Sequence, residues 1–226
     1  MKVVLKKNTP MEYQCSEAYK ILRTNILFCG SQIKTICLTS CLPNEGKSTV
    51  SFNMALSFAA SGKKVIFIDA DLRRSTILGK FIVDQEVLGL SQYLSGQASI
   101  DHIIYDTNIE GLDMIFTGPI PPNPSELLSG ENFNFLLQCL KELYDYVIID
   151  TPPLGSVIDS AIVSKNSDGT ILVISSNDTS SKLMAKVKGQ LEQMDCRILG
   201  TVLNKVKSNR DYYGNYNKKY IKYASK

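Results

Sequence analysis

The fold of this chain is decided by the stretch Thr35-Ile36-Cys37-Leu38-Thr39-Ser40-Cys41-Leu42-Pro43-Asn44-Glu45-Gly46-Lys47-Ser48-Thr49. It opens with a short apolar run, which is typical of a buried strand, and it leads into a helical pattern. Strand, loop and helix in this order are the context of a Walker A phosphate loop. In such a loop Gly46 lets the backbone approach the phosphates, Lys47 reaches the β- and γ-phosphates, and the Ser48 hydroxyl can ligate Mg²⁺.

The loop departs from the usual pattern at one position, where Cys41 stands in place of the first glycine. An ordinary strand–helix turn that carries Gly-Lys-Ser by chance is the alternative interpretation. Two acidic motifs elsewhere in the chain favour the phosphate loop. We therefore expect nucleotide contacts from Pro43, Asn44, Glu45, Gly46, Lys47, Ser48 and Thr49.

Both acidic motifs follow apolar runs. The run 65–68 leads into Asp69 and then Asp71, and the run 146–149 leads into Asp150. The carboxyl ends of parallel strands meet at one edge of an open α/β sheet, where ligands bind. Isolated acids at strand ends are also common as helix caps. Three acids and a phosphate loop at a common edge are better explained by a Mg²⁺–nucleotide site.

Short apolar runs alternate with helical patterns along the chain, which predicts a doubly wound α/β fold with a mostly parallel sheet. We expect a single P-loop NTPase-like domain over residues 1–206 and a flexible tail over residues 207–226. The predicted strands are residues 35–40, 65–69, 112–116, 146–150, 170–175 and 198–204, all buried on both faces. The predicted helices are residues 16–29, 46–61, 131–143 and 180–194. The first helix would be capped by Ser16 and would bury Ala18, Ile21, Leu22 and Ile26, and the third would bury Phe135, Leu136, Cys139, Leu140 and Leu143.

Composition narrows the chemistry. The 226 residues include one histidine, His102, so a Ser-His-Asp triad or a histidine metal cage must use that ring or is absent. The six cysteines form no Cys-x-x-Cys pair, which favours reduced thiols in a cytoplasmic protein. No apolar stretch has the length of a signal peptide core or of a membrane span. We expect a cytoplasmic protein whose membrane contact comes through a partner or a basic tail.

The combined motifs resemble the bacterial tyrosine kinases of the capsule and exopolysaccharide type, which are relatives of the MinD/ParA ATPases. The resemblance covers nearly the whole chain from about residue 16. It rests on the phosphate loop, on an acidic motif of the form Asp-x-Asp-x-Arg, on a Walker B strand and on a tyrosine-rich tail. These read Gly46-Lys47-Ser48-Thr49, Asp69-Ala70-Asp71-Leu72-Arg73, Ile149-Asp150-Thr151-Pro152-Pro153, and Tyr212, Tyr213, Tyr216, Tyr220 and Tyr223.

The resemblance implies an ATP- and Mg²⁺-dependent protein-tyrosine kinase. Its catalytic residues would be Lys47, Asp69, Asp71 and Asp150, with Ser48, Asp71 and Asp150 at the metal. Asp69 is the candidate for orienting or deprotonating the tyrosine hydroxyl, although the roles of Asp69 and Asp71 stay interchangeable at this point. Asn204 would contact adenine, or would simply end a strand. Arg73 and Arg74 would neutralise phosphate or acidic substrate, or would be solvated.

The family also has a Glu-x-x-Arg-x-x-Arg helix that packs against a neighbouring subunit. Here the motif reads Glu17, Lys20 and Arg23, and lysine lacks the bidentate fork of arginine. The resemblance further implies a ring-like homo-oligomer when the tail is unphosphorylated. It also implies a membrane-embedded activator of the polysaccharide chain-length (co-polymerase) type, a cognate tyrosine phosphatase, control of capsular or exopolysaccharide synthesis and export, and a location at the inner face of the membrane.

The net charge of +3 is unevenly distributed. Residues 205–226 hold seven Lys or Arg and one acid, a net charge of +6, whereas the rest of the chain has a net charge of −3. The tail also holds five of the eleven tyrosines. Composition alone allows nucleic-acid binding, attraction to anionic lipid, or a substrate segment phosphorylated in trans. Together with the kinase motifs, it favours the substrate segment and no nucleic-acid partner. Five phosphotyrosines would reverse the charge of the tail, which predicts dissociation of the oligomer.

Two rival functions share the phosphate loop. A MinD/ParA-like positioning ATPase usually carries a second lysine early in the loop, where Leu42 stands, and has no tyrosine tail. A degenerate nucleotide-binding scaffold is suggested only by Cys41 and Lys20. Because Lys47, Ser48 and the acids are all present, the kinase is the better prediction.

Overall fold

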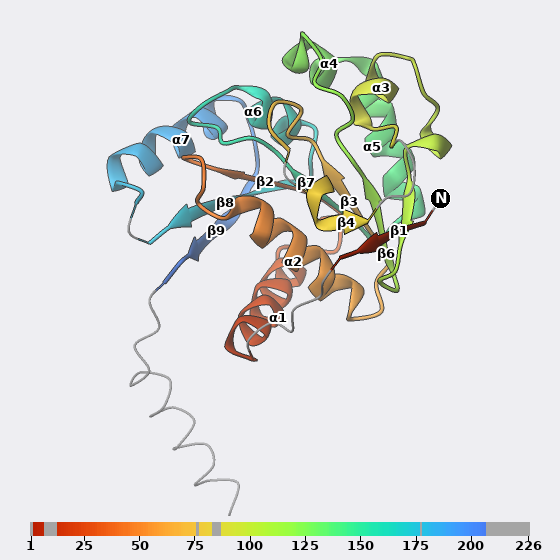
Figure 1. Cartoon of the computed structure of the whole chain (residues 1–226). Helices are drawn as coiled ribbons and strands as arrows, with labels where there is room; N and C mark the ends of the chain where they lie inside the picture. The colour runs from red at the N-terminus through yellow and green to blue at the C-terminus, as the bar shows by residue number, and fades with distance from the viewer. Residues whose placement is uncertain (1, 7–12, 76, 83–86, 177, 207–226) are drawn as a thin grey trace, which may run out of the picture.

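The computed structural model describes residues 2–6, 13–75, 77–82, 87–176 and 178–206. One sheet runs through the molecule, with helices on both of its faces (Figure 1). The strands are β1 (Lys2–Leu5), β2 (Thr35–Ser40), β3 (Val65–Asp69), β4 (Phe81–Ile82), β5 (Tyr105–Thr107), β6 (Leu112–Ile115), β7 (Tyr146–Asp150), β8 (Gly169–Ser175) and β9 (Ile198–Asn204). The helices are α1 (Tyr13–Phe28), α2 (Lys47–Ala59), α3 (Leu90–Leu94), α4 (Pro124–Ser129), α5 (Glu131–Leu143), α6 (Asp159–Lys165) and α7 (Ser181–Gln193), with 3₁₀ turns at Leu78–Lys80 and Ile100–His102.

The strand order is β4-β1-β5-β6-β3-β7-β2-β8-β9. Every neighbouring pair from β6 to β9 is parallel, and antiparallel pairing occurs only at β1–β4 and β5–β6 among the described strands. The predicted doubly wound, mostly parallel α/β sheet is therefore confirmed. The register pairs Asp69 at the end of β3 with Asp150 at the end of β7, so the two predicted acids lie side by side.

The sheet divides the core into two sides, because side chains alternate along each strand. Ile36 and Leu38 of β2 point to the side covered by α1 and α2, where they pack with Val50, Met54 and Phe58. Cys37, which lies between them in β2, points to the opposite side, which α3 to α6 cover. Helix α7 covers a smaller cluster near β8. The central strands β2, β3 and β7 are buried along their whole length, as the continuous apolar runs predicted.

The six predicted strands are all present, and each differs from its predicted range by at most one residue at an end. The strands that the sequence did not predict are β1, β4 and β5, which have four residues or fewer. Helices α3, α4 and α6 were also missed, and each has seven residues or fewer. Segments this short contain too few residues to show a period of two or of 3.6.

Two predictions about α1 are wrong. The helix begins at Tyr13, so Ser16 lies within it and does not cap it. Ile26 is buried and Leu22 packs against the core, but Ala18 is exposed and Ile21 is 62% exposed. The helix rests against α2 through one narrow stripe, and the opposite stripe faces solvent.

The predicted burial also fails in two other places. In α5, Phe135 and Leu143 are exposed, while Phe133 and Leu137 are buried with Leu136 and Leu140. The apolar residues of this helix surround more than one face, and the packing partner selects the buried stripe. Strand β9 is partly exposed rather than buried on both faces, because it is the edge strand of the sheet.

Within the described residues, no helix combines the length and the apolar character needed to cross a membrane. The predicted tail, residues 207–226, lies outside the described residues, and so do its five tyrosines. The division of the chain at residue 206 therefore stays a prediction.

Candidate active site

The phosphate loop connects the buried strand β2 to the first turn of α2. Gly46 has φ of 86°, in the left-handed region that favours glycine, and Asn44 has φ of 65°. A Cβ atom at Gly46 would come 2.2 Å from Nδ2 of Asn204, so no larger residue fits there without a shift. The predicted loop glycine is thus required by both backbone angle and space.

Cys41, which replaces the first glycine, is fully buried and packs with the cluster near β8. Its carbonyl oxygen lies against Gly155, where a Cβ atom would come within 2.1 Å. The close approach that a glycine would permit is therefore provided by Gly155 on the facing segment. The substitution at Cys41 is compatible with an intact loop.

A cavity of about 500 Å³ opens beside the loop. Six of the seven loop residues that were predicted to contact the nucleotide line it: Pro43, Asn44, Gly46, Lys47, Ser48 and Thr49. The opposite wall comes from the segments that follow β3 and β7, namely Asp71, Arg73, Arg74, Pro152, Pro153, Ser156 and Val157, and Ser40 completes the lining. The cavity therefore lies at the carboxyl edge of the sheet, where parallel α/β folds bind ligands.

The side chain of Glu45 does not line this cavity. It is 2% exposed, and its carboxylate accepts hydrogen bonds from the amides of Leu42 (2.7 Å) and Ser175 (3.1 Å) and from the hydroxyl of Thr179. Glu45 thus ties the phosphate loop to the end of β8. The carboxylate of Glu45 therefore stabilises the shape of the loop, while the backbone of Glu45 lies next to Gly46.

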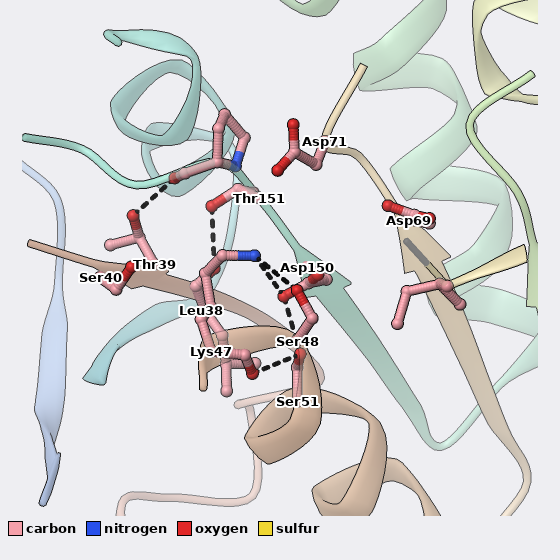
Figure 2. Close-up of polar contacts among 12 residues, drawn as sticks. Leu38, Thr39, Ser40, Lys47, Ser48, Ser51, Asp69, Asp71, Asp150 and Thr151 are labelled. Atoms are coloured by element: carbon pink, nitrogen blue, oxygen red, sulfur yellow. Dashed lines mark hydrogen bonds and ion pairs between the residues drawn. The ribbon is translucent and has the colours of Figure 1, made fainter. Parts of the chain in front are cut away.

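Lys47 and Asp150 form a buried ion pair. Nζ of Lys47 lies 2.8 Å from Oδ1 of Asp150 and 3.1 Å from Oγ of Ser48. Ser51, one turn along α2, donates to the same oxygen of Asp150 at 2.7 Å. Figure 2 shows the ammonium group of Lys47 directed at Asp150, with Asp69 and Asp71 at the end of the neighbouring strand. Burial strengthens this charge-assisted contact, because little water competes for it.

Asp69 has no such cation beside it. It is fully buried, and burial raises its pKa to about 7, helped by the negative charge of Asp150. A hydrogen bond from Ser75 and the charge of Lys47 act in the opposite direction. The Ser75 hydroxyl donates to Oδ2, while Oδ1 has no partner within the part of the chain that the structure describes. Asp69 is thus a carboxyl group that can change its protonation near neutral pH.

Asp71 lies at the cavity wall, and its Oδ1 accepts a hydrogen bond from the backbone amide of Arg74 at 3.0 Å. The two arginines that follow are used differently. Arg73 donates twice to Asp159, at 2.7 and 3.0 Å, and Ser125 donates to the same carboxylate at 2.6 Å. Burial alone would raise the pKa of Asp159, but the hydrogen bonds from Arg73 and Ser125 lower it below its usual value. Both arginines line the cavity, but Arg73 also holds the segment after β3 in place through Asp159.

Asn204 lies at the end of β9, and its amide donates to the carbonyl oxygen of Glu45 at 2.9 Å. It therefore reaches the back of the phosphate loop from the edge strand. This position agrees with both sequence interpretations of Asn204, as a strand-end residue and as a neighbour of the nucleotide.

The three predicted oligomer residues lie on α1, away from this cavity. Glu17 and Lys20 form an exposed ion pair at 2.7 Å. Arg23 donates to the carbonyl oxygen of Ser57 and so anchors α1 on α2 within the same chain. Lys20 and Arg23 border a broad groove of about 1030 Å³ between α1, α2 and the turn before β6.

Sequence reasoning missed three polar residues that shape the site. Ser51 could have been found, because it lies four residues after Lys47 and thus on the same helix face. Ser75 and Asp159 carried no such signal, since they meet Asp69 and Arg73 only through the tertiary fold.

The oxygen donors fit a nucleotide-bound Mg²⁺ better than a metal held by protein alone. Within residues that the structure describes, no group of three His, Cys, Asp or Glu side chains could hold an ion. Ser48, Asp71 and Asp150 instead supply one hydroxyl and two carboxylates near the phosphate loop. Mg²⁺ commonly combines few protein oxygens with waters and substrate phosphates.

The loop, the cavity at the strand ends and the paired acids define a P-loop nucleotide-binding protein. The AAA domain family model matches residues 33–195. The tyrosine-protein kinase CpsD of Streptococcus pneumoniae is 43% identical over 201 residues, which cover 89% of this chain and 88% of that protein. The kinase domain of the Escherichia coli tyrosine kinase ETK superposes with a TM-score of 0.79 at 35% identity, covering 85% of this chain and 78% of that one.

The septum site-determining protein MinD of Pyrococcus horikoshii, complexed with Mg-ADP, superposes less well. Its TM-score is 0.65 at 25% identity, and the match covers 79% of this chain and 73% of that one. The chain belongs to the bacterial tyrosine-protein kinases, a branch of the P-loop fold that also contains MinD. The predicted resemblance is confirmed, and the kinase is preferred over the positioning ATPase.

Proposed function

We propose that this chain transfers the γ-phosphoryl group of ATP to tyrosines of its own C-terminal segment in a neighbouring copy. The observation that carries the proposal is the cavity at the sheet edge, in which the phosphate loop faces Asp71 and the buried acid pair lies behind it. Phosphoryl transfer needs positioning and charge neutralisation more than covalent chemistry. A site built from a lysine, hydroxyls and carboxylates meets that need.

Lys47 would bind the β- and γ-phosphates together with the amides of the phosphate loop and the N-terminus of α2. Its ammonium group is paired with Asp150 in the structure, at 2.8 Å. The nucleotide phosphates would compete with Asp150 for Lys47. Mg²⁺ held by Ser48, Asp71 and Asp150 would neutralise the charge that develops on the phosphate oxygens.

Asp69 would accept the proton of the tyrosine hydroxyl. Its pKa of about 7 suits a group that must be ionised to accept a proton and must release it again. Asp71, which lines the cavity, suits the metal instead. The burial of Asp69 and the exposure of Asp71 to the cavity thus support separate roles for these two acids.

Asn204 would contact the adenine ring. One N–H of its side-chain amide donates to the carbonyl oxygen of Glu45, and its side-chain oxygen would accept a hydrogen bond from the adenine amino group.

The tail, residues 207–226, would be the substrate through Tyr212, Tyr213, Tyr216, Tyr220 and Tyr223. Its positive charge favours approach to the acidic body of a neighbour. Each phosphotyrosine adds about −1.5 to −2 charges, so five would change the segment 205–226 from +6 to roughly −1.5 to −4. We infer that unphosphorylated chains form a ring-like oligomer through Glu17, Lys20 and Arg23, and that phosphorylation releases them.

We infer the partners of the protein from its resemblance to the bacterial tyrosine kinases. A membrane-embedded activator of the polysaccharide co-polymerase type would hold the protein at the cytoplasmic face of the membrane and complete the nucleotide site. A cognate tyrosine phosphatase would reset the tail. The pathway under control would be capsular or exopolysaccharide synthesis and export.

Mass spectrometry after incubation with Mg-ATP, with and without phosphatase treatment, tests the kinase proposal. Wild-type protein should gain phosphates on the tail tyrosines, whereas Lys47→Met should gain none. Lys186→Met, a change at an exposed lysine of α7, is the matched control and should behave as wild type. Absence of phosphotyrosine in wild type with its activator present would refute the proposal.

Mixing two variants tests transfer in trans. Lys47→Met protein with an intact tail should become phosphorylated only when protein with all five tail tyrosines changed to Phe is added. The mass in solution, measured before and after phosphorylation, then tests the oligomer. Equal masses would contradict the release of monomers.

A further inference from the structure

The two buried acids at the sheet edge each receive a hydrogen bond from a serine hydroxyl. Ser51 donates to Asp150, which is also paired with Lys47. Ser75 donates to Asp69 and is the only described partner of that carboxylate. Ser51 supplements an ion pair, whereas Ser75 is the one hydrogen-bond donor to Asp69 among the described residues.

The Ser75 hydroxyl is itself oriented. The backbone amide of Ile77 donates to Oγ of Ser75 at 3.2 Å. With that lone pair occupied, the single hydroxyl hydrogen is directed at Oδ2 of Asp69. A hydrogen bond from a hydroxyl to a carboxylate is among the stronger kinds, so one oxygen of Asp69 is held in place. The other oxygen, Oδ1, is thereby the one left to interact with a substrate.

The segment that carries Ser75 does not depend on this contact for its position. Arg73 is clamped to the buried Asp159, Asp71 accepts from the Arg74 amide, and the Ile77 side chain is buried in the core. Loss of the Ser75 hydroxyl should therefore free the Asp69 carboxylate to rotate without releasing the segment.

We propose that Ser75 is a positioning residue for phosphoryl transfer, which holds Oδ2 of Asp69 so that Oδ1 faces the acceptor tyrosine. This inference rests on the role proposed above for Asp69. In the step concerned, the tyrosine oxygen forms a bond to the γ-phosphorus, the bond from the γ-phosphorus to the bridging oxygen of ADP breaks, and the phenolic proton moves to Oδ1 of Asp69. Ser75 touches neither substrate and acts through the carboxylate.

The test compares variants of the full chain with full-length Lys47→Met protein as the tyrosine acceptor. Ser75→Ala should lower kcat by about tenfold to a hundredfold, the range expected when a reacting group is misplaced, while KM for Mg-ATP changes by less than about twofold. Ser75→Thr keeps the hydroxyl and should restore kcat. Ser125→Ala removes a hydroxyl that supports the Arg73 clamp but does not touch Asp69, and it should stay within about threefold of wild type.

Thermal unfolding of each variant comes first. If Ser75→Ala does not fold, Ser75→Cys keeps the side-chain volume with a weaker donor and takes its place. The proposal is overturned if kcat of Ser75→Ala, or of Ser75→Cys in its place, equals that of wild type. It is also overturned if Ser125→Ala lowers kcat as much as the change at Ser75 does, or if the change at Ser75 acts on KM for Mg-ATP and not on kcat. Asp69→Asn distinguishes a failure of the proposed role of Asp69 from a failure of the proposed role of Ser75. Wild-type activity in Asp69→Asn refutes the role of Asp69. An inactive Asp69→Asn together with a fully active Ser75→Ala refutes only the role of Ser75.

Discussion

The ends of strands β3 and β7 carry neighbouring buried acids whose surroundings differ. Asp150 has the ammonium group of Lys47 at 2.8 Å and the hydroxyl of Ser51 at 2.7 Å. Asp69 has one hydroxyl on one oxygen and no described partner on the other. A buried acid without a cation beside it has its pKa raised, and the pKa of Asp69 is raised to about 7. The site thus keeps its binding charges paired and leaves one carboxyl group able to exchange a proton.

Breaking the pair should have the largest effect. Lys47→Met removes the phosphate-binding cation, and we expect phosphotyrosine formation to fall by about 100-fold to 1,000-fold or more. The same change leaves Asp150 buried without its cation, which should cost about 3 kcal/mol of stability. Kinase assays and urea unfolding at pH 8 measure the two effects.

The double variant Lys47→Met, Asp150→Asn sharpens this prediction. With no charge left unpaired, most of the lost stability should return, whereas activity should stay absent. If Lys47→Met alone unfolds at the same urea concentration as wild type, the buried ion pair contributes nothing and the contrast between the two acids is wrong.

Removing the unpaired charge of Asp69 should raise the stability of the protein, whereas breaking the Lys47–Asp150 pair lowers it. The folded-state pKa of Asp69, about 7, lies above its usual value of 3.8, so the folded protein holds a proton that the unfolded chain releases. Wild-type stability should therefore fall as pH rises from about 4 to 7 and change no further through this group above that range. Asp69→Asn carries no such charge and should be more stable than wild type by a few kcal/mol at pH 8, with little difference near pH 4.

Thermal unfolding across pH 4 to 9 measures this difference. Asp106→Asn, a change at an exposed acid of β5, is the control and should show no comparable trend. An Asp69→Asn variant that is less stable than wild type at pH 8 would contradict the burial of an uncompensated charge at Asp69.

The same residues show which parts of the fold and of the site the sequence could predict. The central strands and the loop could be predicted, because continuous apolar runs and Gly-Lys-Ser are local patterns. The placement of Asp69 beside Asp150 followed from the rule that parallel strands end at one edge. The different surroundings of the two acids could not be predicted. Lys47 and Ser51 meet Asp150 across 103 and 99 residues of sequence, and Ser75 meets Asp69 only after a turn whose shape depends on the tertiary fold. The role of the Glu45 carboxylate could not be predicted either, because its hydrogen bond from the Ser175 amide joins residues 130 positions apart in the chain.

Arg73 and Arg74, which follow β3, allow a paired and an unpaired charge to be compared again, with a smaller expected effect on stability. Arg73→Ala leaves Asp159 buried without its partner, and we expect a loss of about 2 kcal/mol, reduced by the partial exposure of the guanidinium. Arg74→Ala should change stability by less than about 0.5 kcal/mol, because its side chain is exposed. Urea unfolding of the matched pair gives the answer, and equal losses would mean that the Arg73–Asp159 clamp is not formed in solution.

The smallest effect is expected at Asn204, at the far side of the loop. Asn204→Ala removes the hydrogen bond to the Glu45 carbonyl, worth about 1 kcal/mol, which should weaken Mg-ADP and Mg-GDP by a common factor. If the side-chain oxygen also accepts from adenine, Mg-ADP should lose about fivefold more than Mg-GDP, because guanine presents an acceptor in place of the amino group. Calorimetric titration of both nucleotides separates these contributions. An equal loss for the two would mean that Asn204 acts through the phosphate loop alone, and that this edge strand shapes the site without reading the base.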